Sequence, residues 1–247
     1  MEMPEFDVEA VFDAADYHYF YDLTLTPEHT AREVDVLWRL LDLRPGLRVL
    51  DLACGYGRIA NRLAGRGCRV LGLDISDAFL EEARQEARAL DIQAEYVQGD
   101  MRALPWNERF DAVINWYTAF GYFDDAGNRA VLDSVYRALA PGGRFILDMP
   151  NRDMVLRAYQ RAAVVEREGN FQIDQSRYDI ETGRNHVSRT ILRDGRIRRM
   201  NFFVRLFTYP ELSTWLRQAG FGATAGYDQD GEALALDSQR MLVVAVK

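Results

Sequence analysis

The 247-residue sequence contains few of the residues on which covalent cross-links and metal sites depend. Its two cysteines, Cys54 and Cys68, fall in a predicted turn and at the start of a predicted strand, which is typical of reduced thiols. The three histidines, His18, His29 and His186, show no metal-ligand spacing. We therefore predict neither a disulfide framework nor a metal centre.

Long apolar runs and an excess of positive charge are also missing. The sequence has no stretch of eighteen or more apolar residues, and its acidic start at residues 1–5 lacks the basic segment of a secretory signal. The 30 basic and 38 acidic residues give a formal net charge of -8, which disfavours a grip on nucleic-acid phosphates. We expect a cytoplasmic protein that binds a small molecule, without membrane association and with nucleic acid a disfavoured partner.

One segment has the pattern of a buried strand, a tight turn and a helix. The apolar run 49–53 leads into the glycine-containing residues 54–57, and apolar residues then recur at helical spacing. Glycines let the backbone approach a ligand at a helix N-terminus. Asp74 ends the next apolar run, where a carboxylate can accept hydrogen bonds from ribose hydroxyls. The pattern predicts half of a nucleotide-binding βαβ unit.

Two kinds of cofactor fit this spacing. Residues 55–60 satisfy the relaxed G-x-G-x-x-A pattern of nicotinamide and flavin dinucleotide sites. A dinucleotide would place its pyrophosphate beside the carboxylate of Asp51, whereas S-adenosylmethionine carries an ammonium and a sulfonium and no phosphate. Asp51 therefore favours S-adenosylmethionine. An antiparallel hairpin expected within residues 221–246 is a second argument against a dehydrogenase.

Five segments in order resemble the motifs of a known family: residues 49–57, 71–76, 98–101, 110–113 and 139–143. They are similar to the motifs of class I S-adenosylmethionine-dependent methyltransferases, and the resemblance covers residues 45–150. It implies an α/β fold, a doubly wound Rossmann-like sheet of seven strands with an antiparallel final hairpin. It also implies an enzyme that uses S-adenosyl-L-methionine and releases S-adenosyl-L-homocysteine.

The remaining segments are expected to decorate this core. Residues 1–30 form an aromatic and acidic N-terminal lid, residues 31–150 the cofactor-binding core, residues 151–208 a mostly β insertion over the substrate side, and residues 209–247 the completion of the core. In the insertion we expect a helix over 153–163 and strands at 171–173, 178–180, 186–192 and 197–207, with a hairpin turn at Asp194-Gly195. Its seven arginines between residues 184 and 205 either bind an anionic substrate or solvate an exposed face.

The resemblance also implies roles for single residues on the cofactor side. It places Asp100 at the adenine amino group and Met101 against the adenine ring, and the alternative is that Asp100 caps a helical turn. Tyr21, followed by Asp22, resembles a tyrosine that closes over the cofactor in bacterial N-methyltransferases of nucleotide-linked amino sugars. The residues expected to bind the cofactor are Tyr21, Asp51, Ala53, Cys54, Gly55, Gly57, Asp74, Ile75, Asp100, Met101, Asn115 and Trp116.

Aromatic residues dominate the expected acceptor side. Residues 120–123 are similar to a segment of the same N-methyltransferase subgroup in which the matching polar ring touches the acceptor, so Tyr122 is the candidate catalytic residue. Aromatic rings also stabilise cations such as a sulfonium. Tyr17, Tyr117 and Phe120 are expected to contact the substrate, with a core position as the alternative for Phe120.

Methyl transfer is an in-line displacement in which the cofactor carries the activation. The protein mainly aligns the reactants, an effect of about 7 to 11 kcal/mol, so that no nucleophilic triad is needed. We predict a small-molecule methyltransferase acting on nitrogen or oxygen. The alternatives are a methyltransferase acting on a peptide or RNA and a non-catalytic protein that binds S-adenosylmethionine.

Overall fold

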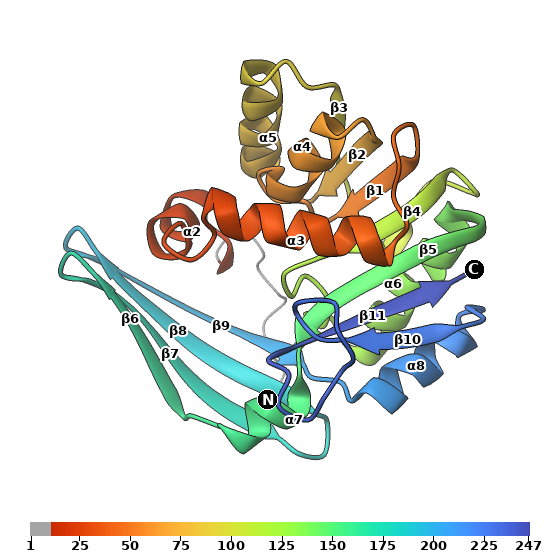
Figure 1. Cartoon of the computed structure of the whole chain (residues 1–247). Coiled ribbons are helices and arrows are strands. Elements are labelled where there is room, and N and C mark those ends of the chain that lie inside the picture. The colour runs from red at the N-terminus through yellow and green to blue at the C-terminus, as the bar shows by residue number, and fades with distance from the viewer. Residues whose placement is uncertain (1–10) are drawn as a thin grey trace.

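The computed structural model describes residues 11–247, which form two β-sheets and the helices around them (Figure 1). The main sheet has seven strands in the order β10-β11-β5-β4-β1-β2-β3. Its first five strands in sequence are parallel, and β11 runs antiparallel to both β5 and β10. This arrangement confirms the predicted doubly wound sheet with an antiparallel final hairpin. The strands are β1 (Arg48–Leu52), β2 (Arg69–Asp74), β3 (Ala94–Gln98), β4 (Phe110–Asn115), β5 (Leu139–Pro150), β10 (Thr224–Tyr227) and β11 (Arg240–Val246).

Helices cover both faces of this sheet, which explains the nearly continuous apolar runs of its strands. Leu50 and Leu52 of β1 pack into the apolar cluster that includes helices α6 and α8, whereas Val49 packs into the cluster that includes α3, α4 and α5. The helices are α3 (Pro27–Leu40), α4 (Arg58–Gly65), α5 (Asp77–Ala89), α6 (Asp125–Ala138) and α8 (Tyr209–Gln218). The α/β layers thus place the carboxyl ends of β1 to β4 at one edge.

Side-chain caps set the points at which the helices beside that edge begin. The Ser76 hydroxyl accepts a hydrogen bond from the Phe79 amide at the start of α5, and Asp124 accepts one from the Gly127 amide at 2.7 Å at the start of α6. Each cap satisfies a backbone N–H that has no partner within its helix. Strand β2 ends at Asp74 and α5 begins at Asp77, with Ser76 as its cap, so the chain passes from strand to helix within two residues.

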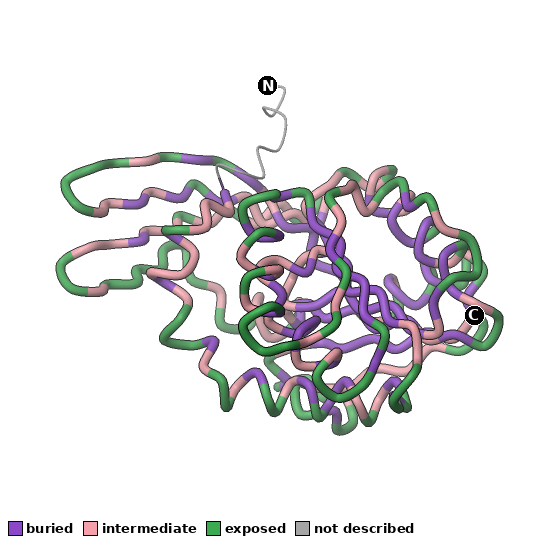
Figure 2. Tube along the Cα trace, turned by 90° about the horizontal axis from the view of Figure 1, so that it is seen from above, coloured by how far each residue is buried: buried purple, intermediate pink, exposed green. Residues whose placement is uncertain are grey.

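A second, antiparallel sheet projects from the core, and the ends of its hairpins extend away from the main body (Figure 2). Its strands are β6 (Ala162–Arg167), β7 (Asn170–Asp179), β8 (Arg184–Arg193) and β9 (Arg196–Arg205), in this order across the sheet. Asp194 and Gly195 both have a positive φ, 51° and 75°, as the predicted two-residue turn requires. The hairpin signal is therefore confirmed.

Two expectations for the insertion were wrong. The helix predicted over 153–163 is α7 (Arg152–Arg157) only, and residues 162–167 form the edge strand β6. The two short strands predicted at 171–173 and 178–180 are one continuous strand, β7. Pairing of β6 with β7 and of β7 with β8 decides these boundaries, and such tertiary pairing overrides local propensity.

Helix α2 (Ala14–Tyr21) lies between the two sheets. Phe20 packs with apolar residues of β8 and β9, while the His18 imidazole is 2.7 Å from the Glu82 carboxylate of α5. Of the predicted N-terminal lid, residues 1–10 fall outside the described part of the chain. From residue 11 onward, every helix is too short or too polar to cross a bilayer.

Gly72→Ala is predicted to destabilise the protein. A Cβ at Gly72, in the middle of β2, would come within 2.7 Å of the Cys54 sulfur and of the Tyr96 ring. Overpacking of this kind costs about 1–3 kcal/mol in the free energy of unfolding, which urea denaturation followed by circular dichroism measures. Gly222→Ala is the matched control, because its nearest neighbour would be 3.8 Å away. Equal losses in both variants would contradict the prediction.

Candidate functional site

A cavity of about 770 Å³ opens at the carboxyl ends of β1 to β4, within the range of roughly 300–1,000 Å³ found for small-molecule sites. Residues that follow these strands form one part of its wall, and residues of α2, β8 and β9 form another. Most predicted site residues meet here. Those that line the cavity are Tyr17, Asp51, Ala53, Cys54, Gly55, Asp74, Ile75, Asp100, Met101, Trp116, Tyr117 and Tyr122.

The turn after β1 forms part of this wall. Ala53, Gly55 and Gly57 have positive φ angles of 60°, 53° and 81°. Gly57 does not line the cavity but caps the start of α4, and a Cβ there would come within 2.8 Å of the Tyr96 hydroxyl. Gly57 therefore lets α4 pack closely against its neighbours, so that the turn stays tight.

Asp74 joins the turn after β1 to the turn after β2. One carboxylate oxygen accepts a hydrogen bond from the Gly55 amide at 2.7 Å, and the other accepts one from the Ser76 amide at 2.9 Å. Burial raises the pKa of Asp74. Each oxygen of a carboxylate can accept a further hydrogen bond. The side chain therefore remains able to receive hydroxyl donors from a ligand in the cavity.

Asp51 is a buried carboxylate at the cavity wall with one oxygen atom that accepts no hydrogen bond from the described residues. Its Oδ2 atom has no hydrogen-bond partner in the described part of the chain. Burial raises the pKa of Asp51 to about 7, the Arg58 guanidinium opposes this shift and the Asp74 carboxylate adds to it. A buried carboxylate at a cavity wall favours a cationic ligand, since an unpaired charge away from water is costly.

Asp100 caps a helical turn, as the alternative prediction stated. Its side chain accepts a hydrogen bond from the Arg102 amide at 2.8 Å and pairs with the Arg102 guanidinium at 2.6 Å, at the start of the short helix η1 (Met101–Ala103). The hydrogen bond from Arg102 lowers the pKa of Asp100. Asp100 and Met101 nevertheless both line the cavity, so capping does not remove them from the site.

Besides Gly57, three predicted site residues do not line the cavity. Asn115 is fully buried and donates a hydrogen bond to the Leu52 carbonyl at 3.1 Å, which ties β4 to β1. The expectation that Phe120 contacts the substrate was wrong. Its ring is fully buried beside Phe207 in the core and cannot contact a substrate from there. Tyr21 stacks on Tyr17 with 4.7 Å between ring centroids, and so supports a residue that does line the cavity.

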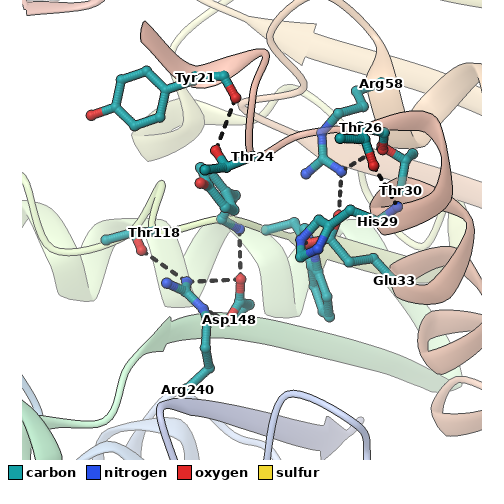
Figure 3. A network of polar contacts seen from close by, with 12 residues as sticks. Tyr21, Thr24, Thr26, His29, Thr30, Glu33, Arg58, Thr118, Asp148 and Arg240 are labelled. Carbon is teal, nitrogen blue, oxygen red and sulfur yellow. Dashed lines mark hydrogen bonds and ion pairs between the residues drawn. The ribbon is translucent and has the colours of Figure 1, made fainter. Parts of the chain in front are cut away.

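The segment after β4 contains two consecutive strained residues. Tyr117 and Thr118 have φ angles of 57° and 63°, a conformation that costs on the order of 1–3 kcal/mol per non-glycine residue. The buried Asp148 accepts a hydrogen bond from the Tyr117 amide at 2.8 Å, and Arg240 donates to Asp148 at 2.6 Å and to Thr118 at 2.8 Å (Figure 3). This network holds the strained turn against the cavity.

Glu33 of α3 organises the opposite side of that turn, and sequence reasoning did not identify it. Its carboxylate accepts a hydrogen bond from the Trp116 indole at 2.9 Å and pairs with the Arg58 guanidinium (Figure 3). Both partners line the cavity, whereas Glu33 stands behind them. Glu33 is 83 residues from Trp116 and 25 residues from Arg58 in the sequence, so no local pattern predicts these contacts.

The candidate catalytic residue Tyr122 lines the cavity among aromatic rings. Its ring meets the Phe12 ring edge-on at 5.5 Å between centroids. Burial raises the pKa of Tyr122 well above its usual range, so its phenol keeps its proton at neutral pH and can act only through hydrogen bonds. Burial likewise raises the pKa of the Cys54 thiol, which argues against a nucleophilic cysteine.

The arginines of the insertion do not share one role. Arg189 pairs with Asp174 at 2.7 Å, Arg193 pairs with Asp16 of α2 at 3.0 Å, and Arg205 is buried beside Glu211. Arg184 lines the cavity together with Phe203, another residue that sequence reasoning missed. Across residues 11–247, no group of three or more His, Cys, Asp or Glu side chains is arranged to hold a metal ion.

Comparisons with known proteins agree with this geometry. Residues 49–143 match the family described as "Methyltransferase domain". The demethylmenaquinone methyltransferase of Thermus thermophilus is 37% identical over 121 residues, which are 46% of this chain and 54% of that protein. The chain thus spans about half the length of this curated relative.

Two solved structures share the fold over nearly the whole chain. An S-adenosylmethionine-dependent methyltransferase from Clostridium acetobutylicum has a TM-score of 0.77 at 16% identity, covering 95% of this chain and 97% of its own. The amino pentose methyltransferase of calicheamicin biosynthesis from Micromonospora echinaspora, solved with S-adenosylmethionine, has a TM-score of 0.64 at 23% identity, covering 100% and 99%.

Asp51→Asn is predicted to stabilise the protein more at high than at low pH. The pKa of Asp51 is raised from 3.8 to about 7 in the folded protein, so the folded state binds the proton more tightly than the unfolded state. The stability that this proton contributes is fully present below pH 3.8 and is lost as the pH rises through about 7. Asparagine does not titrate, so the variant does not lose stability in this way. Its free energy of unfolding relative to the wild type should therefore rise by on the order of 1–3 kcal/mol from about pH 5 to pH 8.

Urea unfolding of both proteins at the two pH values measures this gain. The exposed Asp133→Asn substitution on α6 controls for the change in net charge. A gain for Asp51→Asn that is the same at both pH values would show that the Asp51 carboxyl does not titrate in this interval.

Proposed function

We propose that this chain, which belongs to the class I S-adenosylmethionine-dependent methyltransferases, transfers a methyl group from S-adenosylmethionine to a nitrogen atom of a small-molecule acceptor. The observation that carries the proposal is the pair of carboxylates at the cavity wall, Asp51 and Asp74, on either side of the glycine turn. A buried carboxylate here suits a ligand with positive charge and ribose hydroxyls and opposes a pyrophosphate.

The residues at this end of the cavity fit S-adenosylmethionine group by group. Asp51 would hold the methionine ammonium. Asp74 would accept hydrogen bonds from the ribose hydroxyls. Ile75 and Met101 offer apolar contacts for the adenine ring, with Asp100 beside them.

The bound cofactor supplies an electrophilic methyl group, and the chain's own residues align the acceptor and exclude water. Tyr17, Tyr122 and Phe123 bring aromatic rings to the cavity. The negative faces of such rings stabilise a cation by about 0.5–2 kcal/mol each. In this proposal Tyr122 would form a hydrogen bond with an acceptor group, and its raised pKa excludes a phenolate base.

The lining favours an amine over a hydroxyl as the nucleophile. Among the described lining residues there is no histidine or lysine. Asp51 and Asp74 are assigned to the cofactor, and Asp100 and Asp124 are engaged with Arg102 and the start of α6. A hydroxyl acceptor needs a general base to become nucleophilic, whereas an amine presents a lone pair once it has lost its own proton to solvent. The fold shared with an amino pentose methyltransferase supports the same choice.

Calorimetric titration tests the cofactor assignment. S-adenosylmethionine and S-adenosylhomocysteine should bind the wild-type protein, and Asp74→Asn should weaken both by about tenfold, since one charge-assisted hydrogen bond is worth roughly 1.5 kcal/mol. The exposed Asp77→Asn at the start of α5 is the matched control and should bind as the wild type does. Reduced nicotinamide dinucleotide should give no heat, and binding of it in place of the sulfur nucleosides would overturn the proposal.

Isotope transfer from methyl-labelled S-adenosylmethionine tests the acceptor class. In paired panels of small molecules that differ only by an amine or a hydroxyl, label should enter the amines alone, and its rate should rise with pH as the amines lose their protons. Tyr122→Phe should lower the rate about tenfold, the value of one hydrogen bond of roughly 1.4 kcal/mol. Transfer to the hydroxyl members at equal rates would refute nitrogen selectivity.

A further inference from the structure

Buried polar atoms without hydrogen bonds gather where β8, β9 and the start of α6 meet, at the insertion side of the cavity. Within residues 11–247, six of the nine such side-chain atoms belong to this junction. Folded proteins leave few buried polar groups unpaired, so a concentration of them marks a place where polar contacts are incomplete. The six residues are Asp125, Asn128, Thr182, Arg184, Asn185 and Arg205.

Arg184 is the member of this group that lines the cavity. Its guanidinium lies 3.6 Å from the Asp125 carboxylate, and its Nε atom is buried without a hydrogen-bond partner among the described residues. The Asp125 oxygen that faces Arg184 lies at the same 3.6 Å from Arg205. Asp125 is therefore shared between two guanidinium groups and forms a close contact with neither.

The other arginines of the insertion are engaged or lie at the surface. Arg205 pairs with Glu211 and donates to the Leu206 carbonyl at 2.8 Å, and Arg189 is held by two hydrogen bonds to Asp174. Arg196 and Arg199 are exposed. Among the described arginines of β8 and β9, only Arg184 lines the cavity.

Aromatic rings lie close to two guanidinium groups at this end of the cavity. Arg184 lies over the Phe203 ring at 4.9 Å from its centroid, and Arg102 lies over the Phe123 ring at 4.4 Å. Both rings line the cavity as well. The Arg102 charge is balanced by its pairing with Asp100, whereas Arg184 has only the shared and half-exposed Asp125.

We propose that Arg184 binds an anionic group of the methyl acceptor, either a phosphate or a carboxylate. A guanidinium presents its N–H donors as a fork, which matches two oxygens of such a group. The loose 3.6 Å contact with Asp125 leaves the Arg184 guanidinium able to form this pair. The inference rests on the proposed function, because it assigns the acceptor of that reaction. It predicts an acceptor with an amine at one end and an anionic group at the other.

Calorimetric titration of the protein saturated with S-adenosylhomocysteine tests this site with two simple probes, inorganic pyrophosphate and succinate, at constant ionic strength. At least one probe should bind the wild-type protein, and Arg184→Gln should weaken its binding tenfold or more. Binding of pyrophosphate alone identifies a phosphoryl group, and binding of succinate alone identifies a carboxylate. Arg196→Gln, which removes an exposed arginine from the same hairpin, should leave the affinity unchanged.

One further variant and one control measurement keep the outcome unambiguous. Arg184→Lys keeps the charge but loses the fork, so it should bind the probe more weakly than the wild type and more strongly than Arg184→Gln. All variants should bind S-adenosylhomocysteine as the wild type does. The proposal is overturned if neither probe binds, or if Arg184→Gln and Arg196→Gln weaken binding equally. Loss of S-adenosylhomocysteine binding by the wild type would instead contradict the proposed function.

Discussion

The hydrogen bond from the Gly55 amide to the Asp74 carboxylate is the contact on which the site depends, because it joins the ends of two neighbouring parallel strands at 2.7 Å. It fixes the left-handed turn after β1 against the tip of β2, and the Ser76 amide fixes the same carboxylate from the other side. Two backbone amides thus hold the Asp74 side chain in place, and the carboxylate in turn joins the two strand ends. A site built in this way is largely formed before a ligand arrives.

Most charged side chains around the cavity are paired with another side chain of the protein, and a few have a polar atom without a hydrogen-bond partner among the described residues. Glu33 neutralises Arg58, Arg102 neutralises Asp100 and Arg240 neutralises Asp148, so most ionic groups hold the structure in place. Among the charged residues that line the cavity, Asp51 and Arg184 are the two that have a buried polar atom without a hydrogen-bond partner within residues 11–247. One bears a negative and the other a positive charge. A cofactor with an ammonium and an acceptor with an anion complement this pattern.

Features encoded by adjacent residues could be predicted from the sequence, and features made by distant residues could not. The glycine turn, Asp74 at the strand tip and the Asp194-Gly195 hairpin follow from local conformational preference. The edge strand β6 depends on pairing with β7, and the contact between Glu33 and Trp116 joins residues 83 positions apart. Phe120 is buried beside Phe207, and the Gly121 carbonyl that follows it accepts a hydrogen bond from the Arg205 amide of β9 at 2.8 Å. No local pattern reveals these contacts between distant residues.

Helix α2 couples the two halves of the site. His18 contacts Glu82 of the core at 2.7 Å, and Asp16 pairs with Arg193 of the insertion at 3.0 Å. Tyr17, between these anchors, lines the cavity. A shift of the second sheet must therefore either break a partly buried ion pair or move the ring that borders the cavity. Helix α2 thus links the insertion sheet to the core through contacts on both sides of Tyr17.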